Sequence, residues 1–399
     1  MPKATVLGVA EETSASVVAD MNDEVKTNFN HRRKTHCGVN TVTDDANYEQ
    51  YLQDKLGHLP HAARSVMEPV LRKYRHVFHV EGSNDFRGTD LIEHRRVTVD
   101  AKPIRKAPYR VPFALRKEMD KQVQDMLEKG VIEESSSPWS GPAVLVPKKS
   151  LDGRPKYRFC VDFRSLNAVT QFDTYPLPLI EQASSALHGS KYFSTIDLYS
   201  GFWQVKIAEE DKMKAAFSTP SGHYHFQRLP YGLSNSPASF QRLMDVVLRN
   251  LTGELCYVFI DDVVVFADTI EEHARRPEKV LQRFEKANLL LQPEKCAFAQ
   301  PQVNYLGYVV SRDGVTAFPD KVKAVRQYSV PRNVKEVRSF VGLASFYRRL
   351  VPRFAEIAKS VTQLIRKDVQ FKWESSQQAA FEKLKEILCS EQVLASPDF

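Results

Sequence analysis

The stretch Cys256-Tyr257-Val258-Phe259-Ile260-Asp261-Asp262-Val263-Val264-Val265-Phe266 joins two short runs of β-branched and aromatic residues, with its only charges side by side at the junction. Runs of this composition are typical of strands, so we expect a hairpin with two carboxylates at its tip. Adjacent, partly buried carboxylates repel each other and favour a bound cation. The alternative is a plain turn, although tight hairpins prefer Asn-Gly or Asp-Gly and this junction has no glycine. The stretch alone leaves both interpretations open.

The composition of the 399-residue chain predicts a globular protein of roughly two to four domains. A hydrophobic content of 42% is enough to fill the cores of these domains. The sequence has no run of about 18 apolar residues and no leading apolar segment, so we expect an intracellular protein with no membrane span. The five scattered cysteines fit neither a disulfide framework nor a zinc motif. A net charge of +7 favours a polyanionic partner such as nucleic acid.

Four segments are expected along the chain. Residues 1–55 are polar and aperiodic, and we interpret them as a linker or a fragment of a neighbouring domain, partly disordered. Residues 56–112 begin with an amphipathic helix and continue as an extended strap punctuated by prolines. Strands and helices with one apolar face fill residues 113–318, and residues 319–399 form a basic helical region.

A second hairpin is predicted from strands at 143–146 and 157–162, with basic residues toward its tip. One interpretation is a solvated edge that discourages aggregation. The other is a phosphate clamp formed by Arg158 and Lys148, because Arg offers bidentate donors and Lys a point charge. The residues of the hairpin do not decide between the two.

Asp197 follows the apolar run 192–196, and small residues come directly after it. A carboxylate at the end of a strand is a natural place for a site, but a lone Asp also serves as a helix cap or turn residue. Further along, residues 270–290 predict a helix that Pro277 should break or kink.

The region 321–367 holds twelve Lys or Arg residues against two acids, a local surplus greater than the net charge of the whole chain. Asn333 and Glu336 form the start of a capping box, and an apolar face follows at helical spacing. This pattern predicts helices suited to holding a nucleic-acid backbone.

Residues 229–241 predict a loop followed by a helix, on which Phe240 begins an apolar face. Together with Asp197 and the Asp261-Asp262 hairpin, and in this order, that stretch resembles the reverse transcriptases of gypsy-type LTR retrotransposons, and the resemblance extends over residues 60–399. The resemblance implies an α+β fold: a right-hand polymerase with fingers, an antiparallel palm sheet backed by helices, and a helical thumb and connection. It implies an RNA-directed DNA polymerase that uses dNTPs to extend a primer on an RNA or DNA template during replication of a retrotransposon.

The resemblance also implies that the chain is part of a larger Pol polyprotein with protease, ribonuclease H and integrase. Residues 394–399 resemble the start of the ribonuclease H domain, which is then absent. The expected location is the cytoplasm, in a virus-like particle, with the nucleus as the alternative.

Site residues are carried over position by position. The catalytic, metal-binding carboxylates would be Asp197, Asp261 and Asp262, which would hold two Mg²⁺ ions, with Mn²⁺ as the alternative metal. The nucleotide-binding residues would be Lys148 (with Lys149 as its alternative), Arg158, Phe202, Tyr231 and Gly232. Within that set, Phe202 would block a ribose 2′-hydroxyl.

Two further matches complete the set. The primer grip would be Tyr305, Leu306 and Gly307, and Lys295 falls near the candidate general acid of the family. Two positions depart from retroviral enzymes, because Phe259 stands where they usually carry Tyr and Tyr231 where they carry Gln. Neither is a carboxylate, so the departures bear on nucleotide handling.

The chemistry fits the residues independently of the resemblance. Phosphoryl transfer needs charge neutralised on the attacking, leaving and equatorial oxygens, and two Mg²⁺ ions about 3.5–4 Å apart can do this. Hard cations prefer oxygen ligands, which Asp197 and Asp261 would supply, with Asp262 second in rank. Two rivals remain: a catalytically inactive, truncated or domesticated nucleic-acid-binding remnant, and an RNA-templated RNA polymerase. The bulky ring of Phe202 argues against the second.

Overall fold

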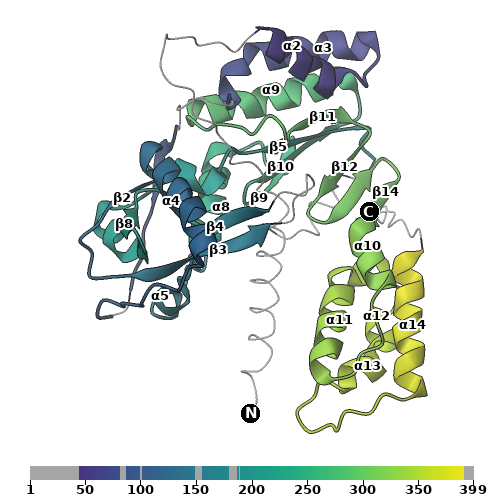
Figure 1. Ribbon diagram of the computed structural model, residues 1–399. Coiled ribbons are helices and arrows are strands. Elements are labelled where there is room, and N and C mark those ends of the chain that lie inside the picture. Colours follow the sequence, from purple (N-terminus) through teal and green to yellow (C-terminus); the bar gives the residue numbers. More distant parts are fainter. Residues whose placement is uncertain are drawn as a thin grey trace.

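The computed structural model describes residues 45–80, 87–98, 101–148, 155–178, 187 and 189–390. Figure 1 shows a central sheet with helices above it, a second sheet on the left of the view, and a group of helices at the lower right. Within the described residues, no helix combines the length and the apolar character needed to cross a bilayer.

The central sheet has the strand order β11-β5-β10-β9 and is antiparallel throughout. Its strands are β5 (Tyr192–Asp197), β9 (Cys256–Phe259), β10 (Asp262–Ala267) and β11 (Ala297–Gln300). The hairpin expected from the opening stretch is therefore confirmed as β9 and β10.

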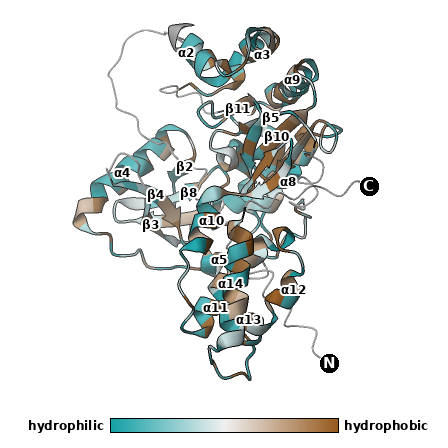
Figure 2. Cartoon of the chain, turned by 90° about the vertical axis from the view of Figure 1, so that its right-hand side faces the viewer, coloured by the Kyte–Doolittle hydropathy of each residue, from teal (hydrophilic) through white to brown (hydrophobic). Residues whose placement is uncertain are grey.

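Both faces of β10 are buried, which explains its unbroken apolar sequence. Val263 and Val265 belong to the larger core, which they share with helices α8 (Ser236–Val247) and α9 (Ile270–Lys286). Val264 and Phe266 point to the other face and join the core of the C-terminal region. The hydropathy colouring of Figure 2 shows brown concentrated in the central strands β5 and β10.

The second sheet has the order β2-β8-β7-β3-β4. Its strands are β2 (Ile132–Glu134), β3 (Gly141–Lys148), β4 (Lys156–Val161), β7 (Ala216–Thr219) and β8 (Gly222–Phe226). Strands β3 and β4 form the expected basic hairpin; its turn and Lys149 lie outside the described residues. Helix α4 (Phe113–Glu128) ends just before Gly130, whose φ of 61° suits a glycine after a helix C-terminus.

The described part of the strap, residues 95–98 and 101–112, is joined to this sheet by backbone pairing between Arg105 and Ser140. It follows β1 (Thr89–His94), which pairs in parallel with β6 (Val205–Ile207). Farther along, the amide of Lys106 donates to the carbonyl of Ser140 at 2.9 Å. Short helices connect the neighbouring strands: α5 (Arg164–Ala168), η2 (Gly201–Gln204), α7 (Glu209–Lys212) and η3 (Met213–Ala215).

The C-terminal region starts with a three-stranded meander and continues as helices, as the basic pattern predicted. The strands are β12 (Gln302–Tyr305), β13 (Tyr308–Ser311) and β14 (Gly314–Ala317). The helices are α10 (Pro319–Arg326), α11 (Val334–Phe346), η4 (Arg348–Leu350), α12 (Phe354–Ile357), α13 (Lys359–Gln363) and α14 (Ser375–Cys389). The side chain of Asn333 caps α11 by accepting from the amide of Glu336 at 3.0 Å.

The N-terminal part of the described chain differs from the expectation that residues 1–55 form a linker. A helix, α2 (Asp45–Leu56), begins before the expected boundary and forms a pair with α3 (His61–Lys73), followed by η1 (Arg75–Val77). Leu52 and Leu56 are fully buried, and the hydroxyl of Tyr48 donates to the carbonyl of Leu71 at 2.6 Å. The burial of Leu52 and Leu56 and this hydrogen bond stabilise the helix, which the polar composition of the segment did not predict. Residues 1–44 lie outside the described residues.

Helix α9 continues through Pro277, so the expected break is wrong. An internal proline costs a helix about 3 kcal/mol. Packing offsets that cost, because Pro277 is buried and α9 lies against both α3 and the central sheet. The Arg276 side chain adds a hydrogen bond of 2.5 Å to the carbonyl of Phe266 on β10.

Candidate active site

Three aspartates lie at one end of the central sheet. Asp197 ends β5, Asp262 begins β10, and the strand register sets them directly opposite each other. Asp261 lies in the two-residue turn between β9 and β10, since Phe259 pairs with Asp262. Asp197 is 8% exposed and Asp261 is 6% exposed. At this burial an uncompensated negative charge is costly, so the end of the sheet is built to receive positive charge.

The turn that carries Asp261 has an unusual backbone. Ile260 adopts a φ of 56°, a left-handed conformation that β-branched residues rarely take. Its buried amide donates to the Oε1 atom of Gln241 on α8 at 2.7 Å. The Nε2 atom of Gln241 donates to Asp245 at 2.8 Å, and the hydroxyl of Tyr175 donates to the same carboxylate at 2.5 Å. A partly buried chain of polar side chains therefore holds the turn of Asp261 in its strained form.

Sequence reasoning missed Gln241. The apolar spacing of the helix after residue 235 marked its neighbour Phe240 as core, and Gln241, at the end of the 229–241 stretch, was given no role. The one available signal was a polar residue bordering an apolar helix face, because a buried amide needs hydrogen-bond partners.

Tyr231 lies next to the carboxylates. Burial raises the pKa of Tyr231 well above its usual value, and the nearby charges of Asp261 and Asp197 raise it further. Its ring stacks on Phe202 with centroids 4.9 Å apart, and Phe202 also contacts Phe240 at 5.2 Å. Phe202, the candidate ribose-excluding residue, is thus held by aromatic packing beside the carboxylates.

Gly232 follows in a loop where its φ of 92° favours glycine. Asn167 on α5 holds this loop, since its Nδ2 atom donates to the carbonyl of Gly232 at 2.9 Å. Its Oδ1 atom accepts from the amide of Ser234 at 3.1 Å. Asn167 is a second positioning residue that the sequence pattern did not reveal.

Lys295 reaches the same site from the loop before β11. Its Nζ atom lies 3.2 Å from Oδ1 and 3.4 Å from Oδ2 of Asp197. The structure therefore brings together the residue matched to the general acid and the first carboxylate. Its role as an acid stays a prediction.

Asp262 faces a different neighbour. Burial raises the pKa of Tyr305 well above its usual value, and the charge of Asp262 is the next cause. Tyr305 ends β12, and the turn after it uses a φ of 50° at Leu306 and 81° at Gly307. The hydroxyl of Tyr347 on the C-terminal helices donates to the carbonyl of Gly307 at 2.8 Å. The residues matched to the primer grip thus connect the carboxylate site with the helical region.

The basic hairpin approaches from the other side. Arg158 on β4 pairs with Val146, and Lys148 pairs with Lys156 toward the tip. The charge of Arg158 lowers the pKa of Tyr231 against the larger effect of burial, which indicates that its guanidinium lies near that phenol. The role of Arg158 in binding phosphate stays a prediction.

The donor set fits a hard cation bound jointly with substrate. No group of three or more His, Cys, Asp or Glu side chains gathers into a metal-binding cluster among the described residues. Asp197 and Asp261 both act on Tyr231, whereas Asp262 acts on Tyr305. Mg²⁺ commonly takes one or two protein carboxylates and completes its shell with water and phosphate oxygens. Which of the three carboxylates would bind the metal stays a prediction.

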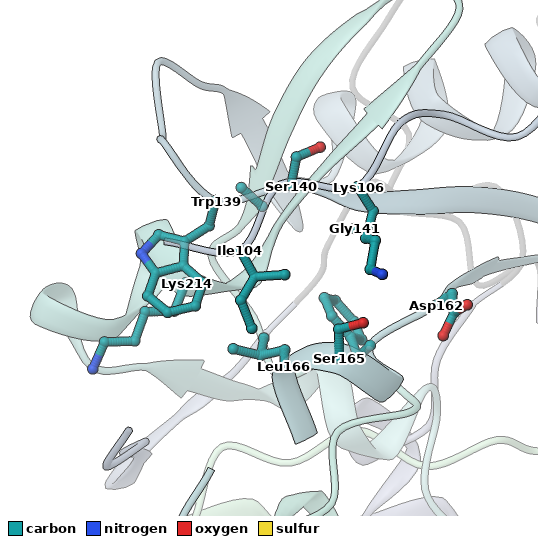
Figure 3. A pocket seen from close by; sticks show the side chains of 11 residues that line it. Ile104, Lys106, Trp139, Ser140, Gly141, Asp162, Ser165, Leu166 and Lys214 are labelled. Carbon is teal, nitrogen blue, oxygen red and sulfur yellow. The ribbon is translucent and has the colours of Figure 1, made fainter. Parts of the chain in front are cut away.

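A small pocket lies elsewhere, between the strap and the second sheet (Figure 3). Ile104 and Lys106 of the strap line one side, and Trp139 and Asp162 are among the other lining residues. The carboxylate of Asp162 already accepts hydrogen bonds from Arg164 and from the hydroxyl of Tyr109, both at 2.7 Å. The candidate active site does not include this pocket.

Comparisons with known proteins agree with this geometry. Residues 146–310 match the family described as reverse transcriptase (RNA-dependent DNA polymerase). The chain is 38% identical over 351 residues to the retrovirus-related Pol polyprotein from transposon 297 of Drosophila melanogaster, covering 88% of this chain and 33% of the relative. It is 39% identical over 316 residues to the corresponding polyprotein from transposon gypsy of the same organism, covering 76% of this chain and 30% of the relative.

Among solved structures, a foamy viral protease-reverse transcriptase in complex with double-stranded DNA aligns with a TM-score of 0.76 and 25% identity. The alignment covers 90% of this chain and 62% of that protein. This similarity confirms the α+β polymerase fold. The chain spans about a third of the length of the two transposon polyproteins.

Proposed function

Because the chain belongs to the reverse transcriptases of LTR retrotransposons, we propose that it is an RNA-directed DNA polymerase that adds dNTPs to a primer on an RNA or DNA template. The observation that carries the proposal is the meeting of Asp197, Asp262 and the strained turn of Asp261 at one end of the central sheet. The inactive-remnant alternative has no observation in its favour, since all three carboxylates and their supports are present.

In this proposal, the residues of the chain bind and orient the substrates. Arg158 and Lys148 attract the triphosphate, and Phe202 excludes a ribose 2′-hydroxyl beside Tyr231. The turn at Leu306 and Gly307 supports the primer end. Lys295, beside Asp197, donates a proton to the departing pyrophosphate.

The proposed metal is Mg²⁺, two ions, with Mn²⁺ as the substitute. When bound by Asp197 and Asp261, with Asp262 contributing, the ions would neutralise charge on the phosphate oxygens. The low exposure of the two principal carboxylates favours this role, because electrostatic interactions are stronger where water is excluded.

The proposed partners are an RNA template, a DNA primer or template, and dNTPs. The structural relative was solved with double-stranded DNA, and another structure of that protein contains an RNA/DNA hybrid. The basic helices after residue 318 would contact the phosphate backbone. We further propose that the chain acts as part of a Pol polyprotein with protease, ribonuclease H and integrase, in a cytoplasmic virus-like particle.

The test is Mg²⁺-dependent dNTP incorporation on a primed RNA template, with Asp197→Asn as the inactivating variant. Asp197→Asn should abolish extension while primer-template affinity stays near that of the wild type, because the change removes a metal ligand and leaves the strand intact. Asp90→Asn is the matched control, since Asp90 is exposed and pairs only with Lys206 among the contacts described. Near-normal turnover in Asp197→Asn would contradict the metal assignment, and an inactive wild type would favour the remnant.

A further inference from the structure

The loop that carries Lys295 is held by a residue far away in the sequence. The Nζ atom of Lys55, at the end of α2, donates to the carbonyl of Glu294 at 2.8 Å and to the carbonyl of Cys296 at 2.6 Å. These two carbonyls belong to the residues on either side of Lys295. One ammonium group therefore bridges the backbone around the candidate general acid.

The inner side of the same loop is bonded to Asp197 itself. The amide of Gln292 donates to the carbonyl of Asp197 at 2.9 Å. The carbonyl of Gln292 then accepts from the amides of Lys295 at 3.2 Å and Cys296 at 3.3 Å, which closes a tight turn. The loop is thus fixed to the first carboxylate on one side and to Lys55 on the other.

We infer that Lys55 is a positioning residue for the reaction, which holds the turn so that the Lys295 ammonium stays at the carboxylate of Asp197. This inference rests on the proposed polymerase function. It gives the N-terminal helix pair, which lies outside the matched family segment of residues 146–310, a role in the active site.

Lys55 can hold the Lys295 loop because its hydrogen bonds to the carbonyls of Glu294 and Cys296 are strong and short. Hydrogen bonds from a charged donor are about twice as strong as neutral ones, and Lys55 is partly buried, so water replaces it poorly. Lys295 in turn sits at 3.2–3.4 Å from its carboxylate, a loose contact that a small loop shift would break. Misplacing a reacting group by about 1 Å can cost about 100-fold in rate.

The experiment compares Lys55→Met with Lys73→Met in the full chain. Lys73 belongs to the same helix pair but binds Glu278 on α9 at 2.7 Å, so its loss removes an exposed contact between α3 and α9 without touching the Lys295 loop. The single-turnover rate at saturating dNTP should fall about 10- to 100-fold in Lys55→Met and stay near wild type in Lys73→Met. Primer-template affinity should change in neither variant. Lys55→Arg, which keeps a charged donor, should recover much of the rate.

A double-mutant cycle separates positioning from general stability. In a Lys295→Ala background, adding Lys55→Met should change the residual rate by no more than about twofold, since residues acting through one another are not additive. An equal loss in both backgrounds would overturn the inference.

A readout that needs no activity is amide hydrogen exchange over residues 292–298 of the free protein. Exchange there should accelerate in Lys55→Met and not in Lys73→Met, and unchanged exchange would overturn the inference. If Lys55→Met does not fold, Lys55→Gln, which keeps a neutral donor, takes its place with an intermediate effect expected. An inactive wild type would refute the proposed function, while the exchange measurement would still decide whether Lys55 orders the loop.

Discussion

Gln241→Leu should uncouple the turn that carries Asp261 from helix α8. The substitution keeps the approximate size of the side chain but removes the only acceptor described for the amide of Ile260 and the donor to Asp245. Gln241 has no solvent exposure, so water cannot enter to replace it. We expect lower stability and slower chemistry from one change that touches no carboxylate.

The magnitude follows from the buried groups left behind. A buried donor without its partner costs about 1–3 kcal/mol. The left-handed backbone of Ile260 already costs about 1–2 kcal/mol. The hydrogen bond from its amide to Gln241 holds the backbone in that conformation. A loss of 1–2 kcal/mol changes a two-state population roughly 5- to 30-fold. If the native turn loses that much free energy relative to a relaxed turn, a smaller fraction of molecules holds Asp261 in place. The extension rate should fall in the same proportion.

The assay pairs urea unfolding with single-turnover primer extension. The matched control is Gln124→Leu on α4, where the glutamine makes an exposed hydrogen bond of 3.1 Å to Glu128. Gln124→Leu should change the free energy of unfolding by no more than about 0.5 kcal/mol and leave extension intact. The reasoning is refuted if Gln241→Leu matches that control in both measurements.

Three further predictions concern acid stability, sugar selection and binding. Burial lowers the pKa of His273 to about 3, whereas the unfolded chain takes up the proton near pH 6.5. The stability that His273 contributes is therefore full above about pH 6.5 and is lost as the pH drops toward 3, by about 1.4 kcal/mol per pH unit. His273→Gln should flatten this slope in urea unfolding at pH 7 and pH 5, and equal slopes would count against it. Phe202→Val should raise rNTP use relative to dNTP use by about 10-fold or more and lower the free energy of unfolding by about 1–3 kcal/mol; unchanged discrimination in competitive incorporation would rule out the excluding role. The triple variant Arg348→Gln, Arg349→Gln and Arg353→Gln should bind all primer-templates more weakly and make shorter products. Its slope of log affinity against log salt should be smaller than that of the wild type. An unchanged slope would show that these arginines do not contact phosphate.

The sequence alone determined the chemistry-bearing end of the central sheet. Strands with β-branched residues on both sides of Asp261 and Asp262 can form a hairpin almost irrespective of context, because adjacent strands pair locally and an apolar run must be buried. The position of Asp197 after a second apolar strand has the same origin. Local pattern was sufficient for these elements, and for the basic helices after residue 318, because periodicity and charge act over a few residues.

Only the tertiary structure decided which distant groups support that site. The register that sets Asp197 opposite Asp262 depends on pairing between strands more than 60 residues apart in the sequence. Helix α2 looked like a linker because its polar residues outnumber the few that it buries, and Pro277 looked like a helix break because the packing that offsets it lies on other elements. The roles of Gln241 and Lys55 could not be predicted, since a glutamine or lysine gains such a role only from the backbone groups that folding brings to it. A hydrogen bond across such a separation is fixed by the packed fold and leaves no periodic trace in the sequence.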